Sequence, residues 1–254
     1  MRNTFVMTSN TKAFVAALAA LRDRGAGEAC LMVVDGEPGL SKTRTAEWWA
    51  VQQGAVLLRA KREWTPSWML RDLLGRVTTE PPANSFEKMY RQALEHLARL
   101  AKQAERDGLT PAVLIDEADH IIGNGRAMET LRDLSDSLEI PFVFVGMGKI
   151  SHQLKRYPQI ASRVGQRVEF QRLSRQDVDA LVKGLCEAEV APDLVDFLYA
   201  ETKGRAREIK EALAPVERAG RRNPGRPVDL AALAGAVLFN DRETTKPVKV
   251  PGAR

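Results

Sequence analysis

Residues 36–43, GEPGLSKT, have types and spacing suited to binding phosphate. They match the pattern G-x-x-x-x-G-K-[ST] except at the sixth position, where Ser41 stands in place of glycine. In such a loop, backbone N–H groups and the positive end of the following helix dipole face phosphate oxygens. Lys42 would reach the β and γ phosphates of a nucleotide, and the Thr43 hydroxyl would bind Mg²⁺. The pattern therefore predicts a nucleoside triphosphate site, and Ser41 raises the question of whether that nucleotide is turned over.

Two acids at the end of an apolar run supply the other half of this chemistry. Residues 113–117, VLIDE, have the pattern of a buried strand that ends in Asp116 and Glu117. Asp116 would hold the Mg²⁺ shell, while Glu117 would orient and polarise an attacking water molecule. The letters DEAD at 116–119 coincide with a helicase motif, but the other helicase signatures are missing from the sequence. Together the two motifs predict hydrolysis of the bound nucleotide.

Apolar runs that alternate with helical segments predict the framework for both motifs. The expected strands are residues 29–35, 54–60, 111–119, 140–148 and 167–170. Helices are expected at 11–24, after the phosphate loop, after a Thr65–Pro66 start, at 86–106 behind a Ser85 cap, and at 126–138. Strands that alternate with helices of this length predict an α/β fold with a parallel sheet covered on both faces.

The strand patterns stop after Leu173. Ser174 and Asp177 have the spacing of a capping box, and further helical stretches are expected at 192–201, 206–217 and 228–239. From Asp241 onward the chain is polar and contains proline, which favours disorder. The expected organisation is an N-terminal helix and linker at 1–28, an α/β core at 29–173, a small helical lid at 174–240 and a disordered basic tail at 241–254.

The composition indicates a globular protein of the cytoplasm. Of the 254 residues, 44% are hydrophobic and 28% charged, which allows a sizeable core. The sequence has no run of eighteen apolar residues, and its start lacks the apolar segment of a secretory signal, so no membrane contact is expected. Cys30 and Cys186 lie far apart in apolar stretches, which indicates reduced thiols in the core.

The net charge of +5 is concentrated in one segment. Residues 148–175 carry seven Lys or Arg side chains against Glu169 alone. Such asymmetry favours a surface that faces a polyanion, although a solvated basic face without a partner gives the same pattern. Trp64, Trp68 and Tyr90 could stack on nucleic-acid bases, but their helical spacing among leucines is more typical of core positions.

Over residues 8–239 the chain resembles the AAA+ ATPases, and within them the branch of phage Mu transposition protein B (MuB), TniB and TnsC. The superfamily motifs are the loop at 36–43, Asp116 and Glu117, an arginine after the fourth strand, and the lid sequence TKGRAREI. The stretches that resemble the MuB branch are WTPSWMLRDLL, LIDEADHI, METLRDL, PFVFVGMGKI and RYPQIASRVGQRVEF.

The resemblance implies ATP and Mg²⁺ as cofactors and assigns further roles. Arg163, or as second choice Arg167, matches the arginine finger that completes a neighbouring subunit's site; an ordinary surface arginine is the alternative. Arg207 matches the sensor-2 arginine of the lid, with Arg205 as its rival. Residues 146–148 contain no polar side chain for sensor 1, which stays unassigned. The implied nucleotide-binding residues are Gly36, Glu37, Pro38, Gly39, Leu40, Ser41, Lys42, Thr43, Arg44 and Asp116, with Thr43 and Asp116 as metal ligands and Glu117, Lys42, Arg163 and Arg207 as catalytic residues.

The resemblance also implies macromolecular partners. Proteins of this branch form a homo-oligomeric ring or helical filament around double-stranded DNA and contact its phosphates from inward loops. The matching positions here are Lys61, Arg62, Lys149, Lys155 and Arg156. Phosphate contacts carry affinity and salt dependence without sequence information. The implied function is delivery of target DNA to a DDE transposase and activation of that enzyme, in a bacterial or phage-infected cell.

Other functions fit parts of the pattern. A helicase loader similar to IstB and DnaC would grip single strands or a helicase, and a nucleotide-locked switch would signal through a partner without turnover. A secretion ATPase of the ExeA type is disfavoured because neither a membrane span nor a wall-binding domain accompanies the motifs. Ser41 bears on the choice, because its Cβ restricts a backbone position that glycine occupies freely. We expect nucleotide binding to survive, and hydrolysis to be slow and stimulated by DNA.

Overall fold

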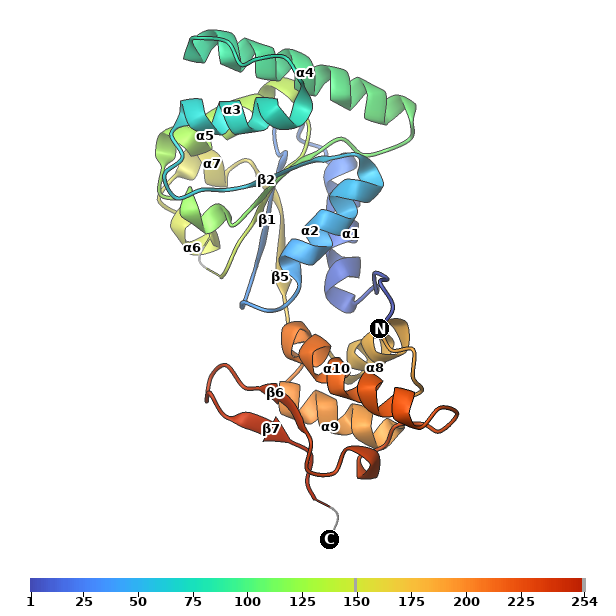
Figure 1. Ribbon diagram of the computed structural model, residues 1–254. Helices are drawn as coiled ribbons and strands as arrows, with labels where there is room; N and C mark the ends of the chain where they lie inside the picture. Colours follow the sequence, from blue (N-terminus) through green and yellow to red (C-terminus); the bar gives the residue numbers. More distant parts are fainter. Residues whose placement is uncertain (149, 253–254) are drawn as a thin grey trace. The chain divides into compact units, whose positions relative to one another are not determined.

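The computed structural model describes residues 1–148 and 150–252 (Figure 1). The chain divides into two compact units, which are described separately. The sheet unit contains Ala13–Glu37 and Lys42–Phe170; the helical unit contains Met1–Lys12, Pro38–Ser41 and Gln171–Arg254. Among the described residues, no helix combines the length and the apolar character needed to cross a membrane.

A five-stranded parallel sheet forms the centre of the sheet unit. Its strands are β1 (Leu31–Gly36), β2 (Val56–Arg59), β3 (Val113–Asp116), β4 (Phe142–Val145) and β5 (Val164–Phe170). The order is β2-β3-β4-β1-β5, and each neighbouring pair is parallel, which confirms the predicted α/β fold. β1, β3 and β4 are buried throughout, as continuous apolar runs predict. Because the strands share one direction, their carboxyl ends meet at one edge of the sheet, where α/β proteins bind ligands.

Helices cover both faces of this sheet, with α2 on one side and α5, α6 and α7 on the other (Figure 1). The bounds are α1 (Ser9–Arg22), α2 (Lys42–Gln53), α3 (Pro66–Val77), α4 (Phe86–Arg106), α5 (Gly125–Leu138), α6 (Ile150–Leu154) and α7 (Pro158–Ala161). The predicted caps are confirmed: the hydroxyl of Thr65 accepts the Trp68 N–H at 3.2 Å, and that of Ser85 accepts the Lys88 N–H at 3.3 Å. Local sequence signals therefore set where α3 and α4 begin.

The aromatic side chains near α3 divide between core and surface. Trp64 is buried, and its Nε1 donates to Oδ2 of Asp72 at 2.8 Å. The buried Trp64 ring is therefore not available for stacking on bases, and Tyr90 is partly buried against the same core and stacks on Phe86. Trp68, in contrast, is 39% exposed, with the Lys61 ammonium 4.9 Å from its ring centroid. The expectation of a core position is thus wrong for Trp68.

The helical unit has a core of its own, built mainly from leucine, isoleucine and valine. Its helices are α8 (Arg175–Leu185), α9 (Pro192–Thr202) and α10 (Ala206–Arg222), and its strands are β6 (Val237–Asn240) and β7 (Pro247–Lys249), which pair antiparallel. The predicted capping box is present at the start of α8, where Ser174 and Asp177 exchange hydrogen bonds between side chain and backbone.

Two predictions for the last part of the chain are wrong. Residues 228–239, expected to be helical, contain the short 3₁₀ turn η2 (Ala231–Leu233) and then β6. Gly235, with φ of 74°, ends the turn, and the β-favouring residues behind it pair with β7. The tail, expected to be disordered over 241–254, carries β7 and is held by an ion pair of Arg242 with Glu208 at 3.2 Å; residues 253 and 254 lie outside the described residues. Strand pairing and ion pairs order a polar segment whose composition alone favours disorder.

Both cysteines are buried free thiols, as predicted. Cys30 lies in the sheet unit, where its thiol donates to the carbonyl oxygen of Gly27 at 2.8 Å. Burial raises the pKa of both thiols, that of Cys186 to about 12. Since the thiolate is the reactive form, neither side chain suits nucleophilic chemistry at neutral pH.

Candidate active site

The loop between β1 and α2 is shaped by a glycine at one end and a lysine at the other. Gly36 has φ of 141°, and a Cβ on it would lie 2.6 Å from the carbonyl oxygen of Phe170, so only glycine fits. Lys42, the first residue of α2, is buried, and its Nζ donates to the carbonyl oxygens of Gly36 and Glu37, both at 2.7 Å. The lysine ammonium thus draws the start of the loop toward the helix that follows it.

Ser41 adopts the backbone conformation that glycine usually provides at this position. Its φ is 69°, in the left-handed region, which costs an L-residue on the order of 1 kcal/mol. The next residue begins α2, where backbone N–H groups and the helix dipole favour an anion. Serine therefore keeps the path of the loop at the cost of local backbone strain.

Asp116 and Glu117 follow one another at the carboxyl end of β3 but have different surroundings. Asp116 is buried as the last residue of the strand. Glu117 has φ of 54° and is partly exposed, and its carboxylate accepts a hydrogen bond from Arg59 at the end of neighbouring β2. This hydrogen bond lowers the pKa of Glu117 and raises the pKa of Arg59. Glu117 is therefore ionised at neutral pH, and Arg59 weakens it as a base.

Two carboxylates accept hydrogen bonds from backbone N–H groups of residues 147 and 148, in the loop after β4. Oδ2 of Asp119 accepts the N–H of Met147 at 2.6 Å, and Oδ1 of Asp35 accepts that of Gly148 at 2.9 Å. A Cβ on Gly146 would lie 2.3 Å from Oδ2 of Asp119, so a side chain at 146 would displace this contact. The loop is thus positioned through its backbone, by acids adjoining the phosphate loop and Glu117.

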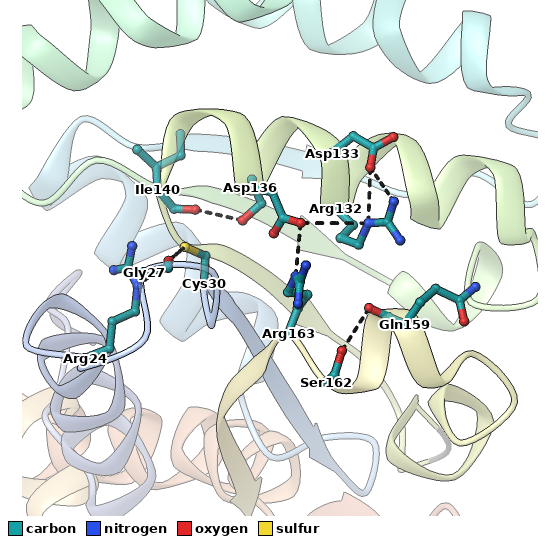
Figure 2. A network of polar contacts seen from close by, with 11 residues as sticks. Arg24, Gly27, Cys30, Arg132, Asp133, Asp136, Ile140, Gln159, Ser162 and Arg163 are labelled. Carbon is teal, nitrogen blue, oxygen red and sulfur yellow. Dashed lines mark hydrogen bonds and ion pairs between the residues drawn. The ribbon is translucent and has the colours of Figure 1, made fainter.

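Arg163 does not lie at this edge of the sheet. Its carbonyl oxygen accepts the N–H of Leu31, the first residue of β1, so it lies at the opposite, amino edge. Figure 2 shows its side chain directed at Asp136 of α5, with Nε 3.0 Å from Oδ2. Arg167 lies within β5, is exposed, and donates to the hydroxyl of Ser151 at 3.2 Å. An arginine at the amino edge is remote from the phosphate loop of its own sheet.

Arg205 and Arg207 of the helical unit have different contacts. Arg205 is buried before α10 and forms an ion pair with Glu243. Arg207, in the first turn of α10, is exposed, and its backbone N–H donates to the carbonyl oxygen of Gly39 at 3.2 Å. Of the two, Arg207 is thus the residue whose backbone contacts the loop at Gly39, whereas the guanidinium of Arg205 binds Glu243.

The donor set also fits a magnesium ion held together with a nucleotide. Among residues 1–148 and 150–252, no group of three or more His, Cys, Asp or Glu side chains could hold a metal. Mg²⁺ in nucleotide sites needs only one or two protein ligands, because phosphate and water oxygens complete its shell. The buried carboxylate of Asp116 and the exposed hydroxyl of Thr43 have the right chemistry for this arrangement.

The sequence matches a family described as an AAA domain over residues 25–154, slightly more than half of the chain. The chain belongs to the AAA domain family. The match includes the phosphate loop, Asp116 and Glu117, and it ends before Arg163 and Arg207. A curated relative of this AAA domain is the "Potential ATP-binding protein" of Staphylococcus aureus, 32% identical over 71 residues. That match covers 28% of the chain and 26% of the relative, about a quarter of each protein.

Solved structures share the fold of this AAA domain. The Orc1 protein of Aeropyrum pernix in complex with DNA has a TM-score of 0.59 and 17% identity, over 88% of this chain and 63% of that one. The Aeropyrum pernix ORC2 protein, in ADPNP–ADP complexes, has a TM-score of 0.60 and 16% identity, over 87% of this chain and 66% of that one. Cdc6p of Pyrobaculum aerophilum has a TM-score of 0.59 and 16% identity, over 91% of this chain and 68% of that one. The chain therefore has the fold of AAA+ P-loop proteins and spans about two thirds of the length of each.

The cations suggested for DNA contact have unequal surroundings in the AAA domain. Lys61 forms an ion pair with Asp72 at 2.6 Å in addition to its contact with Trp68. Arg62, Lys155 and Arg156 are exposed, and their side chains have no hydrogen-bond or ion-pair partner among the residues that the structure describes. Lys149 lies outside the described residues. Lys61 is thus partly neutralised within the protein, whereas the charges of Arg62, Lys155 and Arg156 are not paired with any described residue.

Sequence reasoning missed three side chains of the AAA domain site: Arg59, Asp35 and Asp119. Arg59 ends an apolar strand, and only the pairing of β2 with β3 places it beside Glu117. Asp35 directly precedes the phosphate loop, and Asp119 is the last letter of DEAD, so both were visible as acids near a motif. Their partners are backbone N–H groups of the loop after β4, which leave no mark in a sequence.

We expect Ser41→Gly to stabilise the AAA domain and to raise its hydrolysis rate. Glycine adopts φ of 69° without steric cost, so unfolding should require on the order of 1 kcal/mol more free energy. Denaturant unfolding and steady-state phosphate release would measure the two effects. An unchanged or lower hydrolysis rate would show that Ser41 does not limit turnover, whatever its effect on stability.

Proposed function

We propose that this AAA domain binds ATP with Mg²⁺ and hydrolyses it slowly. The observation that carries the proposal is that Lys42 follows β1, Asp116 ends β3 and Glu117 follows it, all at one edge of a parallel sheet. Mg²⁺, when bound with ATP, would offset charge on the phosphates. Lys42 would exchange its two backbone carbonyl partners for phosphate oxygens, and Asp116 and Thr43 would provide the protein ligands of the metal.

Glu117 is the proposed base that orients and deprotonates the attacking water. Its ionised carboxylate is bound to Arg59 through Oε1, so turning of this pair would leave the carboxylate better placed to accept a proton. Release from Arg59 would also restore the basicity that the hydrogen bond removes. The pair, together with the strained Ser41, supports slow turnover in the isolated chain.

We further propose that the protein oligomerises with ATP on double-stranded DNA and acts in transposition as a MuB-like target selector and transposase activator. The support is the set of MuB-like stretches around α3, β3, β4 and β5, together with the free cations Arg62, Lys155 and Arg156. A solved relative in fold, the Orc1 protein, is described in complex with DNA. Arg163 would serve as the finger in trans, since it lies at the amino edge, once it leaves Asp136.

A nucleotide-locked switch is the second candidate. The Arg59–Glu117 pair favours it, because a base held permanently by an arginine would leave ATP intact. In that case the protein would assemble and signal with ATP but release no detectable phosphate, with or without DNA. The helicase-loader alternative has no structural observation of its own in its favour.

Electron microscopy of the chain with duplex DNA tests the proposed function. Filaments or rings on DNA are expected with ATP and with a non-hydrolysable analogue, but not without nucleotide. Phosphate release measured on the same samples should be slow and should rise with DNA. Assembly on DNA without phosphate release would instead support the switch, and ATP-dependent binding to a helicase in place of duplex DNA would support the loader.

The double variant Lys61→Ala/Arg62→Ala should weaken binding to duplex DNA and reduce its salt dependence. Each phosphate contact contributes about 0.9 to the slope of log affinity against log salt, so loss of both would flatten the slope by up to about 2. Because Lys61 is paired with Asp72, we expect most of the loss from Arg62, and the single variants would separate the two. Titrations of labelled duplex at several salt concentrations would measure the slope; an unchanged slope would remove this pair from the interface.

A further inference from the structure

A hollow of about 550 Å³ opens in the helical unit between the last turns of α10 and the segment from η2 to β6. We call it the arginine hollow, because its charged lining consists of Arg218 and Arg222. Asn223 adds a polar side chain, and the remaining lining residues are small or aliphatic. No carboxylate and no aromatic ring is among the lining residues. The hollow is therefore positive and sterically open.

Both arginines keep their full charge for an external partner. Arg218 and Arg222 are exposed, and neither side chain has a hydrogen bond or ion pair within the described part of the chain. Other arginines of the same unit are neutralised: Arg175 binds Asp196, and Arg242 binds Glu208 and Glu211. Arg218 and Arg222 therefore take no part in the internal ion pairs that the structure describes in the helical unit.

Stabilisation of α10 does not account for the cluster. Cations in the last turn of a helix interact favourably with its dipole, which explains Arg221 and Arg222. Arg218, however, lies one turn earlier, and it is exposed and without a side-chain partner among the described residues. The effect of a helix dipole falls off within the last turn, so it does not account for Arg218.

We propose that the arginine hollow is a docking surface for the phosphate backbone of duplex DNA. Arginine is suited to phosphate because its planar fork can donate two parallel hydrogen bonds. Arg218 and Arg222 are four residues apart and hence neighbours on one helix face, which presents two forks to one strand. Single strands are usually held by stacking their bases on aromatic rings, and the lining has none, so the chemistry favours the duplex.

The proposal rests on the proposed DNA binding and gives the helical unit a contact of its own. None of the cations inferred from the MuB resemblance lies in this unit. The hollow would therefore add phosphate contacts independent of Lys61 and Arg62, and those contacts would not require the nucleotide chemistry of the sheet unit.

The test is Arg218→Gln/Arg222→Gln, with duplex affinity measured in the full chain over about 50–200 mM salt. The expected result is weaker binding and a slope of log affinity against log salt that is flatter by up to about 2. ATP affinity should not change, since both side chains are exposed and unpaired. The thermal midpoint should fall only slightly, because of the two charges only that of Arg222 lies in the last turn of α10. Arg218→Lys/Arg222→Lys should restore the slope, because lysine keeps the charge.

The matched control is Lys102→Gln/Arg106→Gln on α4, which removes two exposed, unpaired cations from the other unit. The control should keep the parent slope. An unchanged slope in the arginine variant, or an equal loss in the control, would overturn the proposal. So would an arginine-dependent affinity for polyglutamate or for single strands that exceeds the affinity for duplex. Failure of the parent chain to bind duplex at all would reject the proposed function itself, whereas parent binding that ignores Arg218 and Arg222 rejects only this inference.

Discussion

Glu117→Gln is expected to lower ATP hydrolysis by roughly 10²–10⁴-fold, the usual contribution of a general base, while ATP stays bound. Glutamine keeps the size of the side chain and can still accept the hydrogen bond of Arg59, but it cannot take a proton from water. Lys42 and Asp116 are untouched, so nucleotide affinity should change little. The variant should therefore accumulate ATP-bound assemblies on DNA, visible by electron microscopy and by retained labelled nucleotide.

Arg59→Ala is the matched control, because it removes the ion pair and keeps the carboxylate. Since Arg59 lowers the pKa of Glu117, the parent base stays ionised to a lower pH than an ordinary glutamate. In Arg59→Ala the pKa should rise, so the acidic limb of the rate profile should move to higher pH, with a rate at neutral pH at or above the parent rate. Parent-level hydrolysis by Glu117→Gln would mean that another group activates the water.

Lys42→Ala is expected to abolish nucleotide-dependent assembly. The ammonium would make at least two charge-assisted contacts with phosphates, and each is worth about 1.5–3 kcal/mol. The affinity for ATP should therefore fall on the order of a hundredfold or more. The substitution also leaves the carbonyl oxygens of Gly36 and Glu37 without the lysine that draws the start of the loop inward.

Equilibrium binding of a fluorescent ATP analogue would measure the loss in Lys42→Ala, and the salt dependence of DNA binding without nucleotide provides the control. The salt slope should be retained if phosphate contacts such as the arginine hollow act independently of ATP. An ATP affinity equal to that of the parent would remove Lys42 from the site. A missing unfolding transition would show that Lys42→Ala does not fold. Lys42→Arg, which keeps a cation in the loop, would then separate loss of folding from loss of nucleotide binding.

The position of Ser41 now has a physical description. The sequence shows only that serine replaces the glycine of the phosphate-loop pattern at position 41. It does not show which backbone conformation the loop adopts there. The backbone keeps φ of 69° and places the following helix as the pattern requires. We therefore expect the serine to affect backbone strain and the rate of ATP hydrolysis. The comparison of Ser41→Gly with the parent protein measures both.

The sequence alone determined the elements and motifs that depend on near neighbours along the chain. Strands read as apolar runs, helix starts follow from caps such as Thr65, Ser85 and Ser174, and the loop at 36–43 is a contiguous pattern. The α/β class followed from their alternation. These features are local, so the information for each lies within a few residues.

Only the tertiary structure decided which distant residues meet. Strand order placed Arg59 beside Glu117, and the path of the chain after β4 brought Met147 to Asp119. The tail became ordered through pairing of β7 with β6, and α10 and η2 together formed the arginine hollow. Such contacts join residues far apart in sequence through backbone groups or single side chains. Because their energy depends on where the whole chain places both partners, a linear pattern does not reveal them.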